Sequence, residues 1–396
     1  MKRCTRCLTK ETVDTITFDE FGVCSVCRQI EFKKDKIDWD DRGRQLQGLI
    51  DEYKGKGLYD CIVPYSGGKD SVFQLWYIVR ELGLRPLVVR YNHWGYRPLV
   101  EENNTRVFKQ LGVDVVEFST SFHVVRETML ESLRRRGDFC WHCHTGIYAG
   151  VMHFAVRFET PLIFWGESTA EYHSWYTFEE MEEVDEKRFN RLMNQGITAD
   201  DMFEFLGGRV DRRDLWMFDY PKRRDLLKLK VRSICLGNYI EWDTKGNVEI
   251  IKRELGWKGQ RVEGVPAAYD YEKIECTFQG MRDYAKYVKR GYGRTNHLMS
   301  IDIRNGRMDR DTALKVEAEV DGKRPASMDW FLDILQITET EFYAILEKHQ
   351  VHPWKFDPTA VETGPRLPDM DLWDRTGLDK PVGPPRGEDG KPLEYV

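Results

Sequence analysis

The sequence of 396 residues contains no run of about eighteen consecutive apolar residues, the length that a membrane-spanning helix requires. Its first residues, Met1-Lys2-Arg3-Cys4, do not form the apolar core of a secretory signal. These two absences predict a cytoplasmic protein without a membrane span. An excess of positive charge is also missing, because the formal net charge is −6. This acidity makes a nucleic-acid partner an unfavoured hypothesis.

The chain also lacks a Walker A phosphate loop. That loop places Ser or Thr directly after a Gly-Lys pair and another glycine five residues before it. Val63 and Asp70 occupy these two places here. The sequence has instead a Ser-Gly-Gly-Lys-Asp-Ser turn at residues 66–71, between an apolar run typical of a strand and a pattern typical of a helix.

A strand, a glycine turn and a helix start, in this order, form a site for an anion. The glycines let the backbone bend, and the free N–H groups of the first helical turn face one point, with the positive end of the helix dipole behind them. We therefore expect pyrophosphate to bind at Ser66, Gly67, Gly68, Lys69 and Ser71. Asp70 would repel phosphate, so it is expected to act through Mg²⁺ or to cap the helix. An ordinary glycine turn is the alternative.

Short apolar runs alternate with helical patterns, which predicts an α/β fold with a doubly wound parallel sheet. The predicted strands are at 59–65, 85–91, 113–118, 161–165 and 231–237. The predicted units are a zinc ribbon at 1–35, a linker helix at 36–57, an ATP-binding α/β domain at 58–247 with a helical insertion at 176–220, a C-terminal helical region at 248–350 and an extended tail at 351–396.

Residues that follow the predicted strands should face the ligand, because a parallel sheet of this kind binds at the carboxyl ends of its strands. We expect the backbone near Tyr65, Tyr91 and Asn92 to border adenosine. Glu167 follows the fourth strand and is predicted to orient ammonia or a metal. A buried ion pair is the alternative role for Glu167.

Four of the nine cysteines form two C-x-x-C pairs near the start of the chain. Cys4 with Cys7 and Cys24 with Cys27 can each aim two thiolates at one ion, which predicts a tetrahedral, structural zinc site. Metal would supply the folding energy of so small a segment. Two redox-active or free cysteine pairs are the alternative.

A second cysteine group is predicted at Cys140, Cys143 and Cys235, since the first two open a helix and the third ends the fifth strand. Three thiols could hold a [4Fe–4S] cluster with one open iron, or a second zinc with an added histidine. Thiols without metal are the alternative. Cys61 and Cys276 are interpreted as packing residues.

Several stretches together resemble the N-acetyl sugar amidotransferase family, a branch of the PP-loop ATPase superfamily that acts in bacterial surface-polysaccharide biosynthesis. The resemblance covers residues 1 to about 350. The similar stretches are the four N-terminal cysteines, 59–71, 140–146, 165–167, 289–294, 300–307 and 321–325.

The resemblance implies an enzyme that uses ATP and Mg²⁺, besides Zn²⁺, to convert the acetamido group of a nucleotide-linked N-acetyl sugar into an acetamidino group, with release of AMP and pyrophosphate. Such products enter O-antigen, lipopolysaccharide or related surface glycans. Ammonia is implied to come from a separate HisH-like glutaminase, often with a HisF-like barrel partner. The sequence has no Gly-x-Cys-x-Gly nucleophile turn typical of a glutaminase.

Within this chemistry, Lys69, Asp70 and Glu167 are the predicted catalytic residues. The predicted substrate-binding residues are Arg290, Arg294, Arg304 and Arg307. Arginine suits bidentate contacts with a diphosphate or a carboxylate. A solvated helix face with internal ion pairs is the alternative for these arginines.

Two rival hypotheses use the same turn. One is a tRNA sulfur transferase that handles sulfur or a cluster with Cys140, Cys143 and Cys235. The net acidity and the C-terminal stretches disfavour it. The other is a nucleotide-binding scaffold without catalysis.

Overall fold

The structure is a computed structural model that describes residues 1–172, 175–181 and 183–373. Its centre is a five-stranded parallel sheet in the order β3-β2-β1-β4-β5. The strands are β1 (Cys61–Pro64), β2 (Pro86–Tyr91), β3 (Asp114–Phe118), β4 (Leu162–Trp165) and β5 (Arg232–Cys235). The predicted α/β class and all five predicted strands are confirmed.

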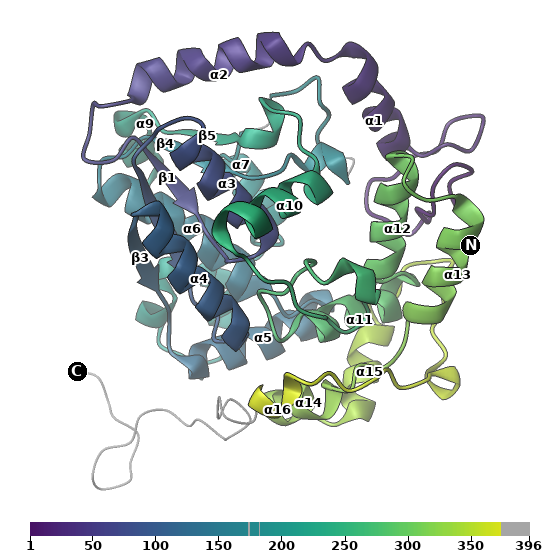
Figure 1. Cartoon of the computed structure of the whole chain (residues 1–396). Coiled ribbons are helices and arrows are strands. Elements are labelled where there is room, and N and C mark those ends of the chain that lie inside the picture. Colours follow the sequence, from purple (N-terminus) through teal and green to yellow (C-terminus); the bar gives the residue numbers. More distant parts are fainter. Residues whose placement is uncertain (173–174, 182, 374–396) are drawn as a thin grey trace, which may run out of the picture.

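Helices cover both faces of this sheet (Figure 1). The helices that follow the strands are α3 (Lys69–Arg80), α4 (Pro98–Leu111), α5 (Phe122–Arg136), α6 (Trp141–Arg157), α9 (Arg223–Leu229) and α10 (Thr244–Leu255). Successive strand residues point to opposite faces, so Val63 packs with α3, α4 and α10, whereas Ile62 packs with α6 and α9. Strands buried on both faces explain the uninterrupted apolar runs in the sequence.

The strand order reverses at β1. The chain moves outward from β1 through β2 to β3, and then returns to place β4 on the other side of β1. Ligands of open parallel sheets bind at such a reversal, beyond the carboxyl ends of the strands. The turn at 66–71 follows β1 and Glu167 follows β4, so both lie at this point.

The N-terminal segment differs from the single linker helix predicted at 36–57. It forms two helices, α1 (Ser25–Lys36) and α2 (Trp39–Tyr53), and α1 already begins within the second C-x-x-C pair. Asp38 separates them and caps α2, because its carboxylate accepts a hydrogen bond from the Asp41 N–H. In Figure 1 α2 runs across the top of the molecule, and α1 descends at the upper right toward the N-terminal segment.

The insertion at 176–220 contains several short helices. They are α7 (Glu186–Arg188), the π-helix η2 (Phe189–Met193), α8 (Ala199–Leu206) and the 3₁₀ helix η3 (Arg212–Phe218), after the 3₁₀ turn η1 (Thr169–Glu171). Met202, Leu215 and Phe218 are buried in one cluster with Trp141 of α6. This packing fixes the insertion against the outer side of α6.

The C-terminal region is helical, as predicted. Its helices are α11 (Gln279–Arg290), α12 (Arg294–Arg304), α13 (Arg310–Val320), α14 (Met328–Leu335) and α15 (Glu339–Glu347); short elements are η4 (Leu236–Asn238), η5 (Ala267–Tyr269), η6 (Pro358–Ala360) and α16 (Met370–Trp373). Helices α12 and α13 hold the N-terminal segment, since Lys10 forms an ion pair with Glu317 at 2.9 Å and the Asn296 amide donates to the Leu8 carbonyl at 2.9 Å.

The tail was predicted to be extended from residue 351 onward, and its first part differs from this prediction. Leu367, Met370 and Trp373 are buried against Trp330 of α14. The predicted tail at 374–396 lies outside the described residues. No helix in the described part of the chain is long and apolar enough to cross a membrane.

A buried ion pair anchors this tail to the loop after β2. The Arg97 guanidinium is fully buried and lies 2.6 Å from the Asp369 carboxylate. We expect Asp369→Ala to lower the free energy of unfolding by about 3–5 kcal/mol, because Arg97 would remain buried without its partner. Denaturant titration measures this difference.

The exposed pair between Arg366 and Asp371 provides a matched control, since its N–O distance is 2.9 Å and its side chains are 58% and 77% exposed. Asp371→Ala should change the stability by less than about 1 kcal/mol. Equal losses in both variants would contradict the anchoring role of Asp369.

Candidate active site

The turn after β1 is held by its own serines. The N–H groups of Ser66 and Gly67 donate to the Ser71 hydroxyl at 3.2 and 3.1 Å, and that hydroxyl donates to the Gly68 carbonyl. Gly67 has a φ of +84°, and a Cβ there would overlap the Asn104 amide. Glycine is therefore required at Gly67 both by its backbone conformation and by the available space.

Lys69 is the first residue of α3 and the buried cation of this turn. Its amine lies 2.7 Å from the Asp70 carboxylate and 2.9 Å from the Glu272 carboxylate. Burial opposes the charged amine, but these two carboxylates raise the pKa of Lys69 above its ordinary value. Lys69 is therefore positively charged at neutral pH.

A C-terminal segment covers the turn. A Cβ on Gly68 would lie 2.6 Å from the Glu275 carboxylate, and the Trp257 indole N–H donates to the Gly67 carbonyl at 3.3 Å. Glu272 belongs to the same segment. The turn at 66–71, predicted to bind phosphate and called the phosphate turn below, is thus covered by residues that lie beyond the predicted sheet domain in the sequence.

Glu167 lies close to this group of charges at the end of β4. Burial, and then the nearby charge of Asp70, raise the pKa of Glu167 to about 8. A carboxyl group with this pKa can both accept and donate a proton near neutral pH. Because Glu167 also lines the main cavity, it can reach a molecule bound there.

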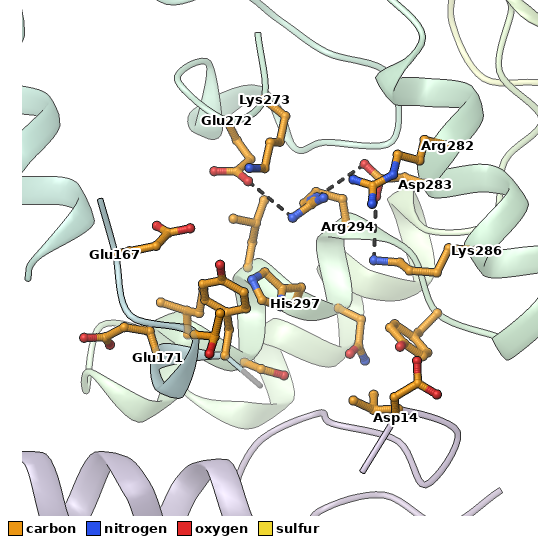
Figure 2. Close-up of a pocket in the computed structure, with 18 of the residues that line it drawn as sticks. Asp14, Glu167, Glu171, Glu272, Lys273, Arg282, Asp283, Lys286, Arg294 and His297 are labelled. Carbon is orange, nitrogen blue, oxygen red and sulfur yellow. Dashed lines mark hydrogen bonds and ion pairs between the residues drawn. The ribbon is translucent and has the colours of Figure 1, made fainter. Parts of the chain in front are cut away.

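The cavity has a volume of about 600 Å³, and Lys69 is one of its lining residues. Figure 2 shows the labelled side chains of Glu167, Glu272 and Arg294 in its wall. Its wall comes from the N-terminal segment, the ends of β1 and β4, the insertion and helices α11 and α12. Among the described residues, twelve Lys and Arg residues and eight Asp and Glu residues line it. The cavity is therefore positive in a chain whose net charge is −6. Such a cavity attracts an anionic ligand.

The four predicted arginines all line this cavity, but their partners differ. The Arg294 guanidinium faces the inner charges, 3.5 Å from Glu272 and 3.3 Å from Asp283. Arg304 instead donates to the Thr9 hydroxyl at 2.8 Å and to the Cys7 sulfur at 3.5 Å. Arg304 thus supports the cysteine cluster as well as the cavity wall.

The other two predicted arginines join separate parts of the chain. Arg290 lies 2.7 Å from the Asp14 carboxylate and donates to the Thr12 carbonyl, so it binds the N-terminal segment. Arg307 forms an ion pair with Asp243 at 2.5 Å. Both roles match the ion-pair alternative considered for these arginines, whereas a substrate contact stays a prediction.

The side chains of the residues predicted to border adenosine pack against neighbouring protein side chains. The Tyr65 ring packs on Phe108, with ring centres 4.8 Å apart, and the Tyr91 ring packs on Phe118 at 5.1 Å. The Asn92 amide donates to Glu117 at 3.1 Å. Only the backbone at these strand ends is left to border a nucleotide, and this contact stays a prediction.

The four N-terminal cysteines form a compact group, and all are buried. Their Sγ atoms lie within 4.8 Å of one another, with 3.6 Å between Cys7 and Cys24 and 3.9 Å between Cys4 and Cys27. Four sulfurs around one zinc ion, each at about 2.3 Å, would be about 3.8 Å apart. The group can hold zinc or an iron–sulfur centre, and its spacing favours a single ion.

The second predicted cysteine group is not brought together in the same way. Cys140 and Cys143 pack with the C-terminal helices, whereas Cys235 is buried on the sheet near Arg188. Among the described residues, only the four N-terminal cysteines satisfy the spacing of a mononuclear metal site. Cys276, which was interpreted as a packing residue, packs with Cys140 and Cys143. The thiol that lies with this pair is therefore that of Cys276 and not that of Cys235.

Sequence reasoning missed the acidic segment over the turn. Glu272 and Glu275 stand in a stretch of alternating charge that matches no motif, and only the fold brings them to Lys69. A signal did exist for Arg282 and Lys286, which also line the cavity: they are four residues apart in a predicted helix and so share a face.

The fold and site define an α/β protein with a glycine turn and a buried lysine at the reversal of a parallel sheet. Residues 264–367 match the family described as "LPS biosynthesis protein WbpG-like, C-terminal domain". This match supports a role in lipopolysaccharide or related glycan biosynthesis and, with it, an enzyme. The matched residues include the acidic segment over the turn and helices α11 to α15.

A curated relative is an uncharacterized protein, MJ1599, from Methanocaldococcus jannaschii. It is 24% identical over 143 residues, which are 36% of this chain and 50% of the relative. The chain thus spans half the length of this relative, whose printed name assigns no activity.

Removal of metal from the cysteine cluster tests its structural role. We expect the purified protein to carry one equivalent of zinc and Cys7→Ser to lose it, because three thiolates leave the site incomplete. Since Thr9 and Asp14 line the cavity, the N-terminal wall should become sensitive to proteolysis. Elemental analysis and limited proteolysis measure the two effects.

Cys276→Ser is the control, as Cys276 is a partly exposed cysteine outside the cluster. Its zinc content and its proteolysis pattern should match those of the unmodified protein. A Cys7→Ser protein that retains a full equivalent of metal would contradict the assignment.

Proposed function

We propose that this protein is an ATP-dependent amidotransferase of surface-polysaccharide biosynthesis. It transfers AMP to the acetamido oxygen of a nucleotide-linked N-acetyl sugar and replaces that oxygen with nitrogen from ammonia. The observation that carries the proposal is the shared site: Lys69 of the phosphate turn and the helices matched to a lipopolysaccharide biosynthesis domain line one cavity.

The first step activates a poor electrophile. The acetamido oxygen attacks the α-phosphorus of ATP, the bond between the α- and β-phosphates breaks, and pyrophosphate leaves with that electron pair. The amide nitrogen loses its proton to water, and the product is an O-adenylated imidate. The protein contributes position and charge, since the buried Lys69 amine and the N-terminal end of α3 stabilise the departing pyrophosphate.

Because carboxylates surround Lys69, the proposed step needs a metal cation in addition to the Lys69 amine. Asp70 and Glu272 both lie within 3 Å of the Lys69 amine, and a triphosphate would add further negative charge. Carboxylate oxygens are the ligands that Mg²⁺ prefers. Asp70 and the neighbouring Glu272 would together hold the Mg²⁺ ion, and this ion would neutralise the phosphate oxygens.

The second step forms the amidine. Ammonia attacks the imidate carbon, one proton leaves the attacking nitrogen, and AMP departs with the former acetamido oxygen. Glu167 is suited to accept the proton, because it faces the cavity and its pKa is about 8. Ammonia is proposed to come from a separate HisH-like glutaminase, with a HisF-like barrel as a second partner.

A direct assay tests the whole reaction. Purified protein is incubated with ATP, Mg²⁺, ammonium chloride and a panel of UDP- and CMP-linked N-acetyl sugars. We expect AMP, and a sugar nucleotide lighter by the mass difference between O and NH, in one panel member by mass spectrometry. Formation of ADP, or AMP formation with the mass of every sugar nucleotide unchanged, would reject the proposal.

Lys69→Met should lower kcat/KM for ATP by about 10²- to 10³-fold, the range found when one charge-stabilising donor is removed. Initial rates of pyrophosphate release measure this loss. Lys258→Met is the matched control, because Lys258 is exposed and directly follows Trp257, which covers the turn. Similar losses in both variants would indicate damage to the fold rather than loss of the Lys69 charge.

The pKa of Glu167 predicts a pH dependence of the reaction. The carboxyl group must be ionised to accept a proton, so kcat/KM for ammonia should rise with pH and level off above about 8. Glu167→Gln should lower the plateau value of kcat/KM and abolish its rise with pH. Rates are measured at constant free NH₃, so that ionisation of ammonium does not contribute. An unchanged rise with pH in Glu167→Gln would exclude Glu167 as the proton acceptor.

A further inference from the structure

One face of α11 carries a row of three cations. Arg282, Lys286 and Lys289 are spaced by four and three residues, so they follow one another along the same side of the helix. All three line the cavity, and Figure 2 shows the labelled side chains of Arg282 and Lys286 directed toward its interior. Neighbours in such a row are about 4.5 to 6 Å apart along the helix. We call these three residues the α11 basic row.

The acids near the basic row do not neutralise it fully. Lys286 lies 3.6 Å from the Asp283 carboxylate, which Arg294 shares at 3.3 Å. Arg282 lies 4.0 Å from Asp138, at the limit of an ion pair, and its buried Nε has no hydrogen-bond acceptor among the described residues. The row therefore has capacity for further negative charge.

Lys289 adds to this capacity, because its amine donates to the Arg136 backbone carbonyl at 3.3 Å rather than to a carboxylate. Burial lowers the pKa of Lys286 to about 8, although Asp283 opposes the change. An anion beside Lys286 would favour its charged form. Binding of an anion and protonation of this amine would thus support each other.

The cavity is polarised along its length. Lys69 at the phosphate turn is surrounded by Asp70, Glu167 and Glu272, whereas the α11 basic row lies beyond Arg294. Figure 2 shows the same separation, with Glu167 and Glu272 on one side and Arg282 and Lys286 on the other. A ligand with one anionic end and one neutral end has a single favourable orientation in this field.

We propose that the α11 basic row binds the diphosphate of the nucleotide-linked sugar and so directs its neutral acetamido group toward Glu167 and the phosphate turn. The identity of this ligand rests on the proposed function, but its binding needs no turnover. Two neighbouring cations match the two phosphate groups, so a nucleoside diphosphate should bind more tightly than a nucleoside monophosphate.

The test is calorimetric titration of the full-length protein with UDP, without ATP or sugar. Arg282→Gln and Lys286→Met should each weaken UDP binding by at least about tenfold, as expected for loss of a charged hydrogen bond. Lys286→Arg keeps the charge and should restore most of the affinity. CMP should bind more weakly than UDP to the unmodified protein, and the difference should shrink in Lys286→Met.

Lys245→Met is the matched control, because Lys245 lines the same cavity but forms an ion pair with Asp302 at 2.6 Å. UDP binding that depends on Lys245 and not on the basic row would overturn the proposal, as would UDP binding lost only in Lys69→Met. Failure of UDP to bind the unmodified protein would overturn it too. If the basic row binds UDP and no sugar nucleotide is converted, the anion site stands and the proposed reaction fails.

Discussion

The buried contact between Lys69 and Glu272 is the interaction on which the candidate site depends. Lys69 begins the first helix of the sheet domain, whereas Glu272 precedes the C-terminal helices. Both ions are buried, and each also pairs within its own region, Lys69 with Asp70 and Glu272 with Arg294, so their mutual contact joins two sets of buried charges. The pair therefore fixes the C-terminal region over the phosphate turn, and the cavity exists because the two regions meet there.

The cysteine cluster performs the same task on the other side of the cavity. A segment of this size cannot bury enough apolar surface to hold a fixed shape, and a tetrahedral ion would replace the missing core. Arg304 connects the cluster to α12 through Thr9 and the Cys7 sulfur. A metal far from the phosphate turn can thus determine the shape of the substrate cavity.

The sequence revealed the sheet and its turn because their signals are local. Each strand is a short apolar run, and the turn needs glycine for its backbone, as the φ of +84° at Gly67 shows. The cysteine cluster could also be predicted, because it is made of two C-x-x-C pairs. Such features could be predicted without knowledge of how distant segments pack.

Contacts between distant segments could not be predicted. Arg97 and Asp369 are 272 positions apart, and neither belongs to a motif, so the packed tail was unexpected. The four predicted arginines all line the cavity, but Arg290 and Arg307 form ion pairs there. Composition and helical spacing identify the cationic side chains. Only the fold determines which of them are neutralised by a carboxylate and which still have charge to offer a ligand.

The ion pairs from Lys69 to Lys286 form one connected series within the cavity. Glu272 lies between Lys69 and Arg294, and Asp283 lies between Arg294 and Lys286. A triphosphate that takes Lys69 leaves Glu272 with Arg294, and a diphosphate that takes Lys286 leaves Asp283 with the same guanidinium. Each ligand replaces one carboxylate at its cation, and no buried charge loses all its partners. Because Arg294 pairs with both Glu272 and Asp283, a ligand bound at one end of the cavity would change the electrostatic surroundings of the other end.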